Sequence, residues 1–191
     1  MTDEQTRRSR IVGGVALECV VGDIAAQADM EAVVNAANAE LRIGGGVAGA
    51  IHRAAGPGLE EEGRSLAPIR PGEAVVTSGH RLPNDYVIHC LGPVYGRDEP
   101  AAELLESCYG EALSRAEELG VGTVAFPAIS TGAFGYPLEE AAGIALRTVV
   151  ARAPNLASVR RIRFVLFDER TFAVHARMLD EVAPEVDEEN E

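Results

Sequence analysis

The sequence contains no lysine and no tryptophan, and only 5% of its residues are aromatic. Every basic side chain is an arginine, so any mechanism that needs a lysine amine is excluded. The chain also lacks an apolar run of about 18 residues, the length that marks a membrane-spanning helix. Its first ten residues, MTDEQTRRSR, lack the apolar core of a signal peptide. We therefore expect a soluble protein that makes no membrane contact and stays in the cytoplasm.

Cysteine is also scarce. Cys19, Cys90 and Cys108 are odd in number, far apart and set in apolar surroundings. This pattern predicts reduced, buried thiols rather than disulfides or a metal site. The histidines at 80, 89 and 175 are scattered and do not have the spacing of zinc ligands. We therefore expect neither a metal nor a cofactor.

The formal net charge is −13, and much of it lies at the end of the chain. Residues 180–191 hold seven of the 30 acidic residues, and the other 23 exceed the 17 arginines by six. A surface of this sign repels phosphate backbones, so no duplex nucleic acid is expected as a partner. A phosphate site in this chain must work locally, through backbone amides and helix ends.

A chain of 191 residues that is 47% hydrophobic suits one globular domain. We place it at 11–183, between a flexible tail at 1–10 and an acidic tail at 184–191. Strands are predicted at 15–21, 32–37, 73–79, 86–92, 122–129 and 161–168, and helices at 47–55, 100–119, 138–151 and 171–182. Strands that alternate with helices predict an α/β sandwich around a parallel or mixed sheet.

Two glycine-rich loops follow predicted strands and precede predicted helices. The first lies within NAANAELRIGGGVAG at 35–49, and the second is STGAFGYP at 130–137. Ligands of open α/β sheets bind at the carboxyl ends of strands, and glycine-exposed N–H groups at a helix start attract phosphate. Either loop alone is better explained as an ordinary tight turn. Two such loops together favour a diphosphate ligand.

Residues Gly44, Gly46 and Gly49 also match the GxGxxG fingerprint of dinucleotide-binding oxidoreductases. That motif should follow its strand almost directly and precede a ribose-binding acid at the end of the next strand. Here several mostly polar residues separate the strand from the glycines, and the acids at 60–62 lie in a helical run. We interpret the match as chance.

A series of ordered motifs resembles the macrodomain family, and most of all its MacroD-type and bacterial O-acetyl-ADP-ribose deacetylase branch. The motifs are GDI at 22–24, NAAN at 35–38, GGGV at 44–47, HRAAGP at 52–57, VIHCLGP at 87–93, AFPAISTGAFGYP at 125–137 and FVLFDE at 164–169. The resemblance covers nearly all of the chain from 15 to 182. It implies a three-layer α/β/α sandwich with a central mixed sheet, and ADP-ribose or ADP-ribosylated proteins as partners.

The resemblance also implies a role for each matching residue. Asp23 would accept a hydrogen bond from the adenine amino group, Phe167 would pack on the ring, and Asp168 would lie near the proximal ribose. Loops 44–47 and 130–134 would hold the diphosphate, with hydroxyl donors at Ser130 and Thr131. The implied ligand-binding residues are Asp23, Ile24, Ala36, Asn38, Gly44, Gly45, Gly46, Val47, Ser130, Thr131, Gly132, Ala133, Phe134, Phe167 and Asp168.

Catalysis is implied for Asn38 and Gly46, because Asn38 would orient the distal ribose, against which Phe134 would lie. Asn35 is expected to brace the loop. MacroD-type hydrolases carry GGGVDG, with an aspartate that activates water, and this chain has Ala48 there. Coronaviral macrodomains also carry GGGVAG, and the family implies that such members can still release mono-ADP-ribose. His52 is interpreted as a packed or capping residue.

We expect a metal-independent hydrolase, weakened by the loss of the motif aspartate, and keep a non-catalytic binding module as the alternative. The first is an enzyme that hydrolyses ADP-ribosyl esters, either mono-ADP-ribosyl-glutamate or mono-ADP-ribosyl-aspartate, or O-acetyl-ADP-ribose. The second is a non-catalytic module that only binds ADP-ribose. Ala48 favours the second function, whereas the motifs around Asn38 and the two glycine loops are compatible with both.

Overall fold

A computed structural model describes residues 6–184, which form a seven-stranded mixed sheet between helices. The strands are β1 Arg7–Val12, β2 Val15–Val21, β3 Ala32–Ala36, β4 Ala74–Ser78, β5 Tyr86–Cys90, β6 Thr123–Phe126 and β7 Arg161–Leu166. The helices are α1 Gly46–Ala55, α2 Gly58–Gly63, α3 Ala101–Leu119, α4 Leu138–Arg152 and α5 Glu169–Val182, with 3₁₀ turns η2 Ile24–Ala26 and η3 Ala153–Asn155. The sheet order is β1-β2-β7-β6-β3-β5-β4.

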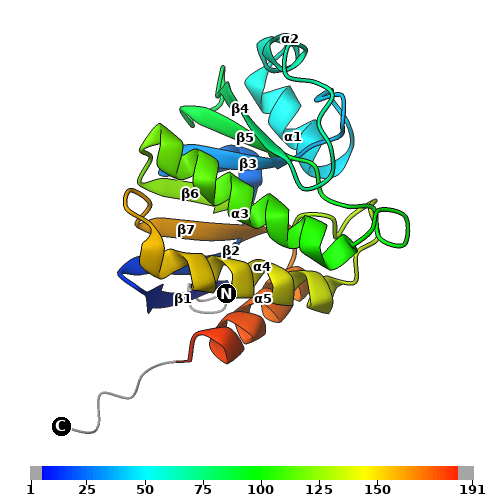
Figure 1. Ribbon diagram of the computed structural model, residues 1–191. Coiled ribbons are helices and arrows are strands. Elements are labelled where there is room, and N and C mark those ends of the chain that lie inside the picture. Colours follow the sequence, from blue (N-terminus) through cyan, green and yellow to red (C-terminus); the bar gives the residue numbers. More distant parts are fainter. Residues whose placement is uncertain (1–5, 185–191) are drawn as a thin grey trace, which may run out of the picture.

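The five inner strands are parallel, and the edge strands β1 and β4 run antiparallel to their neighbours. Parallel strands are covered on both faces, which explains why β3 is almost continuously buried rather than alternating. Helices α3 and α4 cross one face of the sheet and α5 lies beside them (Figure 1). The predicted α/β fold with a central mixed sheet is confirmed.

The core lies mainly under α3, α4 and α5. At its centre the rings of Tyr109, Phe126 and Phe164 are buried, with ring centroids 5.4 to 6.0 Å apart. The other face is covered by α1 and α2, where Ile51 and Leu59 pack in a second apolar cluster. This second face also carries most of the buried polar side chains that matter for the site.

All three cysteines are buried and free, as the sequence predicts. Burial raises the pKa of the Cys19 and Cys108 thiols to about 12, so neither is a reactive thiolate. The three cysteines therefore serve as small apolar core residues.

The prediction of a flexible tail over 1–10 is wrong for residues 7–10, which belong to strand β1. This strand pairs antiparallel with β2 across a glycine turn at 13–14. Two of its arginines form ion pairs: Arg7 pairs with Glu18 at 2.7 Å, and Arg10 pairs with Asp180 of α5. Residues 1–5 and 185–191, which include most of the predicted acidic tail, lie outside the described residues. Within 6–184, no helix is both long and apolar enough to span a bilayer.

Candidate functional site

The carboxyl ends of β2, β7, β6, β3 and β5 meet at one edge of the sheet. β3 and β6 are neighbours, yet the chain leaves β3 toward α1 on one face and leaves β6 toward α4 on the other. Open α/β sheets bind ligands at such a switch point. The predicted segments all lie at the ends of these strands: 22–24 after β2, 36–47 from the last residue of β3 onward, 130–134 after β6 and 167–168 after β7. We name the two halves of this edge the β2–β7 end and the β3–β6 end.

The first glycine loop opens α1 and presents a row of backbone N–H groups. Gly45 is the N-cap residue, and Gly46 has a φ of +54°, a left-handed conformation that glycine adopts without steric cost. Among the described residues, none accepts a hydrogen bond from the N–H groups of residues 44–48. The positive end of the α1 dipole lies behind them. This row can therefore bind an anion through backbone groups alone.

This loop packs closely against α1, and small residues make the close approach possible. A Cβ on Gly49 would meet the Arg53 guanidinium at 2.8 Å and would also crowd the Gly44 carbonyl, so a larger residue does not fit without a shift. Ala48 is 5% exposed, and its methyl group faces the loop. Val47 packs on the apolar cluster of α1. Position 48 thus supplies packing and carries no acid or base.

In the second loop, the two hydroxyl groups face inward. Ser130 has a φ of +66°, and its hydroxyl donates to the Pro93 carbonyl at 2.8 Å. Gly92 lies so close that a Cβ there would overlap Ser130 Oγ. Thr131 Oγ1 donates to the Ala128 carbonyl at 2.8 Å. The expectation of hydroxyl donors to a diphosphate is not met in this structure, because each hydroxyl has given its single hydrogen to the backbone.

The second loop offers backbone donors instead. No acceptor among the described residues takes a hydrogen bond from the N–H groups of Gly132, Ala133 or Phe134. Phe134 packs against the apolar cluster that contains Leu41 and Leu91, which brings this loop next to the segment after β3. The β3–β6 end therefore combines two rows of backbone amides, at 44–48 and 132–134.

Asn38 lies after β3 and shapes the turn that leads to the first glycine loop. Its Nδ2 donates to the Arg42 carbonyl at 2.8 Å, and its Oδ1 accepts from the Arg42 N–H at 3.0 Å. One N–H and one lone pair of the amide are left for a ligand. Ala36, at the end of β3, is half-buried and pairs with Cys90 of β5.

Asn35 does not brace this loop as expected. It is 1% exposed, and its Nδ2 lies 3.1 Å from Nδ1 of His89 on the neighbouring strand. His89 Nε2 lies 2.9 Å from Thr77 Oγ1. The loop-bracing role belongs to Asn38, and Asn35 belongs to a buried polar row that crosses β3, β5 and β4 beneath the site.

Two buried imidazoles lie beneath the β3–β6 end. Burial lowers the pKa of His89 to about 3, and burial also lowers the pKa of His52 on α1. Their ring centroids are 6.5 Å apart. Both rings are therefore neutral at physiological pH, and His52 is packed in the interior as the sequence interpretation proposed.

At the β2–β7 end, two aspartates cap helical turns. Asp23 Oδ1 accepts from the Ala25 N–H at 2.9 Å and caps η2, and Ile24 behind it is buried. Asp168 caps α5 by accepting from the Thr171 N–H at 2.8 Å, and this bond lowers its pKa. Phe167, which directly precedes Asp168, is 93% exposed, with its ring open to a planar partner.

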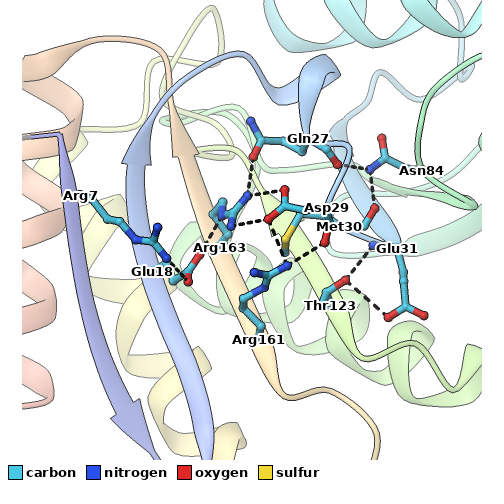
Figure 2. Close-up of polar contacts among 10 residues, drawn as sticks. All are labelled: Arg7, Glu18, Gln27, Asp29, Met30, Glu31, Asn84, Thr123, Arg161 and Arg163. Atoms are coloured by element: carbon cyan, nitrogen blue, oxygen red, sulfur yellow. Dashed lines mark hydrogen bonds and ion pairs between the residues drawn. The ribbon is translucent and has the colours of Figure 1, made fainter. Parts of the chain in front are cut away.

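The sequence interpretation missed three residues that shape the site: Gly92, Gln27 and Arg163. Arg163 is only 8% exposed, and Figure 2 shows its guanidinium among Glu18, Gln27 and Asp29. The available signal was an arginine at an inward position of the strand RIRFVL, which is otherwise buried. Charged residues are rarely buried unless paired, so this position implied hidden acidic partners.

Two cavities of about 240 and 380 Å³ lie elsewhere, between α3 and α4. Their lining includes Glu103 and Glu106 and none of the predicted site residues. Each lining also holds one arginine, Arg152 or Arg147, but the glutamates outnumber it, so the net charge disfavours a phosphate ligand. The backbone amides at the carboxyl edge are the better anion site.

Comparison with known proteins agrees with this geometry. The Macro domain family model matches residues 34–145. The chain is 45% identical over 167 residues to the O-acetyl-ADP-ribose deacetylase of Klebsiella pneumoniae, a match that covers 85% of this chain and 95% of that protein.

Solved structures share the fold. The Oceanobacillus iheyensis macrodomain with ADP matches with a TM-score of 0.88 and 36% identity, over 92% of this chain and 96% of that chain. The Trypanosoma brucei macrodomain in complex with ADP-ribose matches with a TM-score of 0.77 and 35% identity, over 84% of this chain and 68% of that chain. By family match, by sequence identity and by fold, the chain belongs to the macrodomain family.

Proposed function

We propose that this protein binds ADP-ribose along the carboxyl edge of the sheet and hydrolyses ADP-ribosyl esters. The observation that carries the proposal is the pair of amide rows at 44–48 and 132–134. Two anion-binding rows beside each other fit a diphosphate. The Klebsiella pneumoniae relative, an O-acetyl-ADP-ribose deacetylase, and the Trypanosoma brucei structure with ADP-ribose support the same ligand.

The strand order fits an extended ligand with a base at one end and a ribose at the other. Along the edge the order is Asp23 after β2, Phe167 after β7, loop 130–134 after β6 and Asn38 after β3. Adenine would lie at the β2–β7 end, the diphosphate between the amide rows, and the distal ribose beside Asn38. This order matches the order of the groups in ADP-ribose.

The β2–β7 end has the groups that adenine needs. Asp23 uses Oδ1 for its cap, which leaves Oδ2 to accept from the adenine amino group. The exposed Phe167 ring can stack on the base, since aromatic faces bind planar rings well. Asp168 would lie near the proximal ribose.

For hydrolysis, we assign positioning of the distal ribose to Asn38 and ordering of the attacking water to the Gly46 region. Water adds across the ester bond and yields ADP-ribose and a free carboxylate. A carboxylate leaves with little acid assistance, so a well-placed water beside a substrate phosphate can suffice. ADP-ribosylated glutamate or aspartate on a protein and O-acetyl-ADP-ribose are the two proposed substrate types.

A second function, a reader that binds ADP-ribose without turnover, is favoured by one observation. Ala48 is buried, and at this position of α1 it supplies a methyl group and no base. His52 cannot substitute for a base from its buried position one turn further along the helix.

Two measurements test these proposals. Calorimetry should show that ADP-ribose binds far more tightly than AMP, because AMP fills neither the second phosphate position nor the distal ribose position. Equal affinity for the two would overturn the binding proposal. Incubation with a glutamate-ADP-ribosylated protein should then release free ADP-ribose. Tight binding without release would identify the protein as a reader.

A further inference from the structure

A partly buried ionic cluster lies beneath the β2–β7 end, on the sheet face opposite α3 and α4, with Glu18 and Arg163 inside and Asp29 at the surface. Arg163 of β7 donates through Nε to Glu18 at 2.8 Å, and through Nη1 and Nη2 to the two carboxylate oxygens of Asp29, both at 2.8 Å. Glu18 and Arg163 are 4% and 8% exposed. Figure 2 shows that Arg7 reaches Glu18 from the other side.

The cluster fixes the segment that follows the η2 turn. Arg161 donates to the Asp29 carbonyl at 2.7 Å, so both the backbone and the side chain of Asp29 are held (Figure 2). Asn84 donates to the carbonyls of Gln27 and Met30 at 2.8 and 2.7 Å. The four residues 27–30 thus receive side-chain donors from two separate segments of the chain, strand β7 and the loop before β5.

Gln27 connects this cluster to Asp23. Its Oε1 accepts from Arg163 Nη1 at 3.0 Å, and its Nε2 donates to the Asp23 carbonyl at 2.8 Å. The same carbonyl accepts from the Ala26 N–H, and the Asp23 carboxylate is held by the Ala25 N–H. The position of the free Asp23 oxygen is therefore set by a continuous path from Arg163 through Gln27.

Such a cluster is poorly explained by stability alone. Taking Arg163 and Glu18 out of water costs much of what their attraction returns, and the best-attested use of a buried ion pair is to fix one arrangement among several. The arrangement fixed here is the η2 turn. A hydrogen bond to an adenine amino group depends strongly on distance and angle, so a fixed turn makes Asp23 selective.

We propose that Gln27 and Arg163 are positioning residues that set the preference of this site for adenine over other bases. They act through the Asp23 backbone and do not touch the ligand. The proposal rests on the proposed function, since it requires that Asp23 contacts the base of ADP-ribose.

The test compares ADP-ribose with its hypoxanthine analogue, inosine diphosphate ribose, which has a carbonyl in place of the amino group. Calorimetry on the wild-type protein should show a preference of about tenfold or more for ADP-ribose, the range of one hydrogen bond to a charged group. In Gln27→Glu, the new carboxylate keeps an acceptor for Arg163 and loses the donor to the Asp23 carbonyl. Its adenine preference should fall at least about threefold.

Two controls separate positioning from a merely structural role. Gln27→Glu should keep a cooperative unfolding transition, since Arg163 retains Glu18 and Asp29 as partners. Arg7→Met removes a partner of Glu18 without touching Gln27, and it should keep the wild-type base preference. If Gln27→Glu weakens both ligands equally or keeps the full preference, the positioning proposal is overturned while ADP-ribose binding stands. If the wild type binds neither ligand, the proposed function fails and this proposal fails with it.

Discussion

The two ends of the carboxyl edge are built from different chemical groups. The β3–β6 end presents backbone N–H groups at 44–48 and 132–134, and the imidazoles buried beneath it are neutral. The β2–β7 end is positioned by ions, with Arg163 paired to Glu18 and Asp29. In the proposed complex, the β3–β6 end would recognise the ligand through backbone groups, and the β2–β7 end through a side chain that charged groups hold in place.

This difference suits the groups that each end would bind. Backbone amides cannot titrate and need no cation, so a chain with net charge −13 can hold a diphosphate without a basic patch. Backbone amides that bind the diphosphate do not distinguish one base from another, however. Selectivity needs a directed side-chain acceptor, and Asp23 is one. Substitutions at the β3–β6 end should therefore act on folding and turnover, and those at the β2–β7 end on affinity and selectivity.

The largest expected effect is acid destabilisation by buried imidazoles, of which His89 lies beneath the β3–β6 end and His175 lies outside both ends. The pKa of His89 is about 3 and that of His175 on α5 is about 4, both below the ordinary value because burial disfavours the charged ring. The unfolded chain then binds more protons below pH 6.5, so stability is complete above pH 6.5 and is lost as the pH falls toward the folded-state values. Between pH 7.5 and 5, each imidazole should remove roughly 2 kcal/mol from the free energy of unfolding.

Urea unfolding at pH 7.5, 6 and 5 measures this loss. His175→Gln is the matched control, because His175 lies on α5 outside both ends, and the substitution should remove the share of the pH dependence due to one imidazole. In both proteins, protonation of His52 at low pH should further reduce the free energy of unfolding, since burial lowers the pKa of His52 as well. A free energy of unfolding that stays constant from pH 7.5 to 5 would show that these rings are not held neutral.

The next largest effect is on turnover, in Asn38→Ala. The substitution removes both hydrogen bonds to Arg42 and the amide that would orient the distal ribose. Misplacement of a reacting group by about 1 Å can cost about 10²-fold in rate, so single-turnover release of ADP-ribose should fall by about that factor. The dissociation constant should change much less, because the amide rows and the β2–β7 end are intact.

Asn155→Ala, at an exposed asparagine of η3, serves as the control and should leave both quantities unchanged. If Asn38→Ala instead binds weakly but turns over normally at saturating substrate, Asn38 contributes only uniform binding. Substitutions at the β3–β6 end would then affect binding rather than turnover, contrary to our inference.

At the β2–β7 end, Asp23→Ala should reduce ADP-ribose affinity by about 1–3 kcal/mol, the range for a hydrogen bond to a charged group. Asp23→Asn sharpens the result, because its single amide oxygen can still cap η2 while its NH₂ group cannot accept from adenine. We expect Asp23→Asn to lose nearly as much affinity as Asp23→Ala, measured by calorimetry. Wild-type affinity in Asp23→Asn would reduce Asp23 to a helix cap.

The sequence predicts the fold well where apolar periodicity is strong, and it fails where pairing depends on distant partners. Strand β1 was missed because the sequence RRSRIV has no apolar period, and its order comes from pairing with β2 and from acids at 18 and 180. The inner strands and the long helices were placed within a few residues, because their buried faces repeat regularly.

For the site, sequence motifs located the segments correctly at the carboxyl edge but could not orient the side chains. The direction of a hydroxyl depends on which carbonyl lies nearby, so the inward turn of Ser130 onto Pro93 was not predictable. The same holds for Asn35, whose partner His89 lies on a strand 54 residues away in the sequence. Roles of backbone N–H groups are easier to predict from sequence, because their directions depend on the conformation of the loop and not on side-chain partners elsewhere.

The smallest expected effect is a gain, in Ala48→Asp. Ala48 is the third residue of α1, where a carboxylate meets a row of free N–H groups and the positive end of the helix dipole. The fold should accept the change, because the Ala48 methyl group already faces the glycine loop, although the site is only 5% exposed. A carboxylate there also lies near the proposed diphosphate, so affinity for ADP-ribose should fall slightly by like-charge repulsion.

General-base assistance contributes about 10²–10⁴-fold when the base is well placed, but a grafted base lacks the neighbours that would hold it. We therefore expect at most about a tenfold faster single-turnover release of ADP-ribose from a modified glutamate. Ala48→Asn has the same shape without the basicity, so it should show no gain, and ADP-ribose affinity measured in parallel shows whether either variant is misfolded. If Ala48→Asp binds ADP-ribose normally and hydrolyses no faster than Ala48→Asn, water activation at the β3–β6 end does not pass through position 48. Attack by water would then depend on the substrate phosphate held by the amide rows. If the wild type also releases no ADP-ribose, the β3–β6 end serves only to bind the ligand.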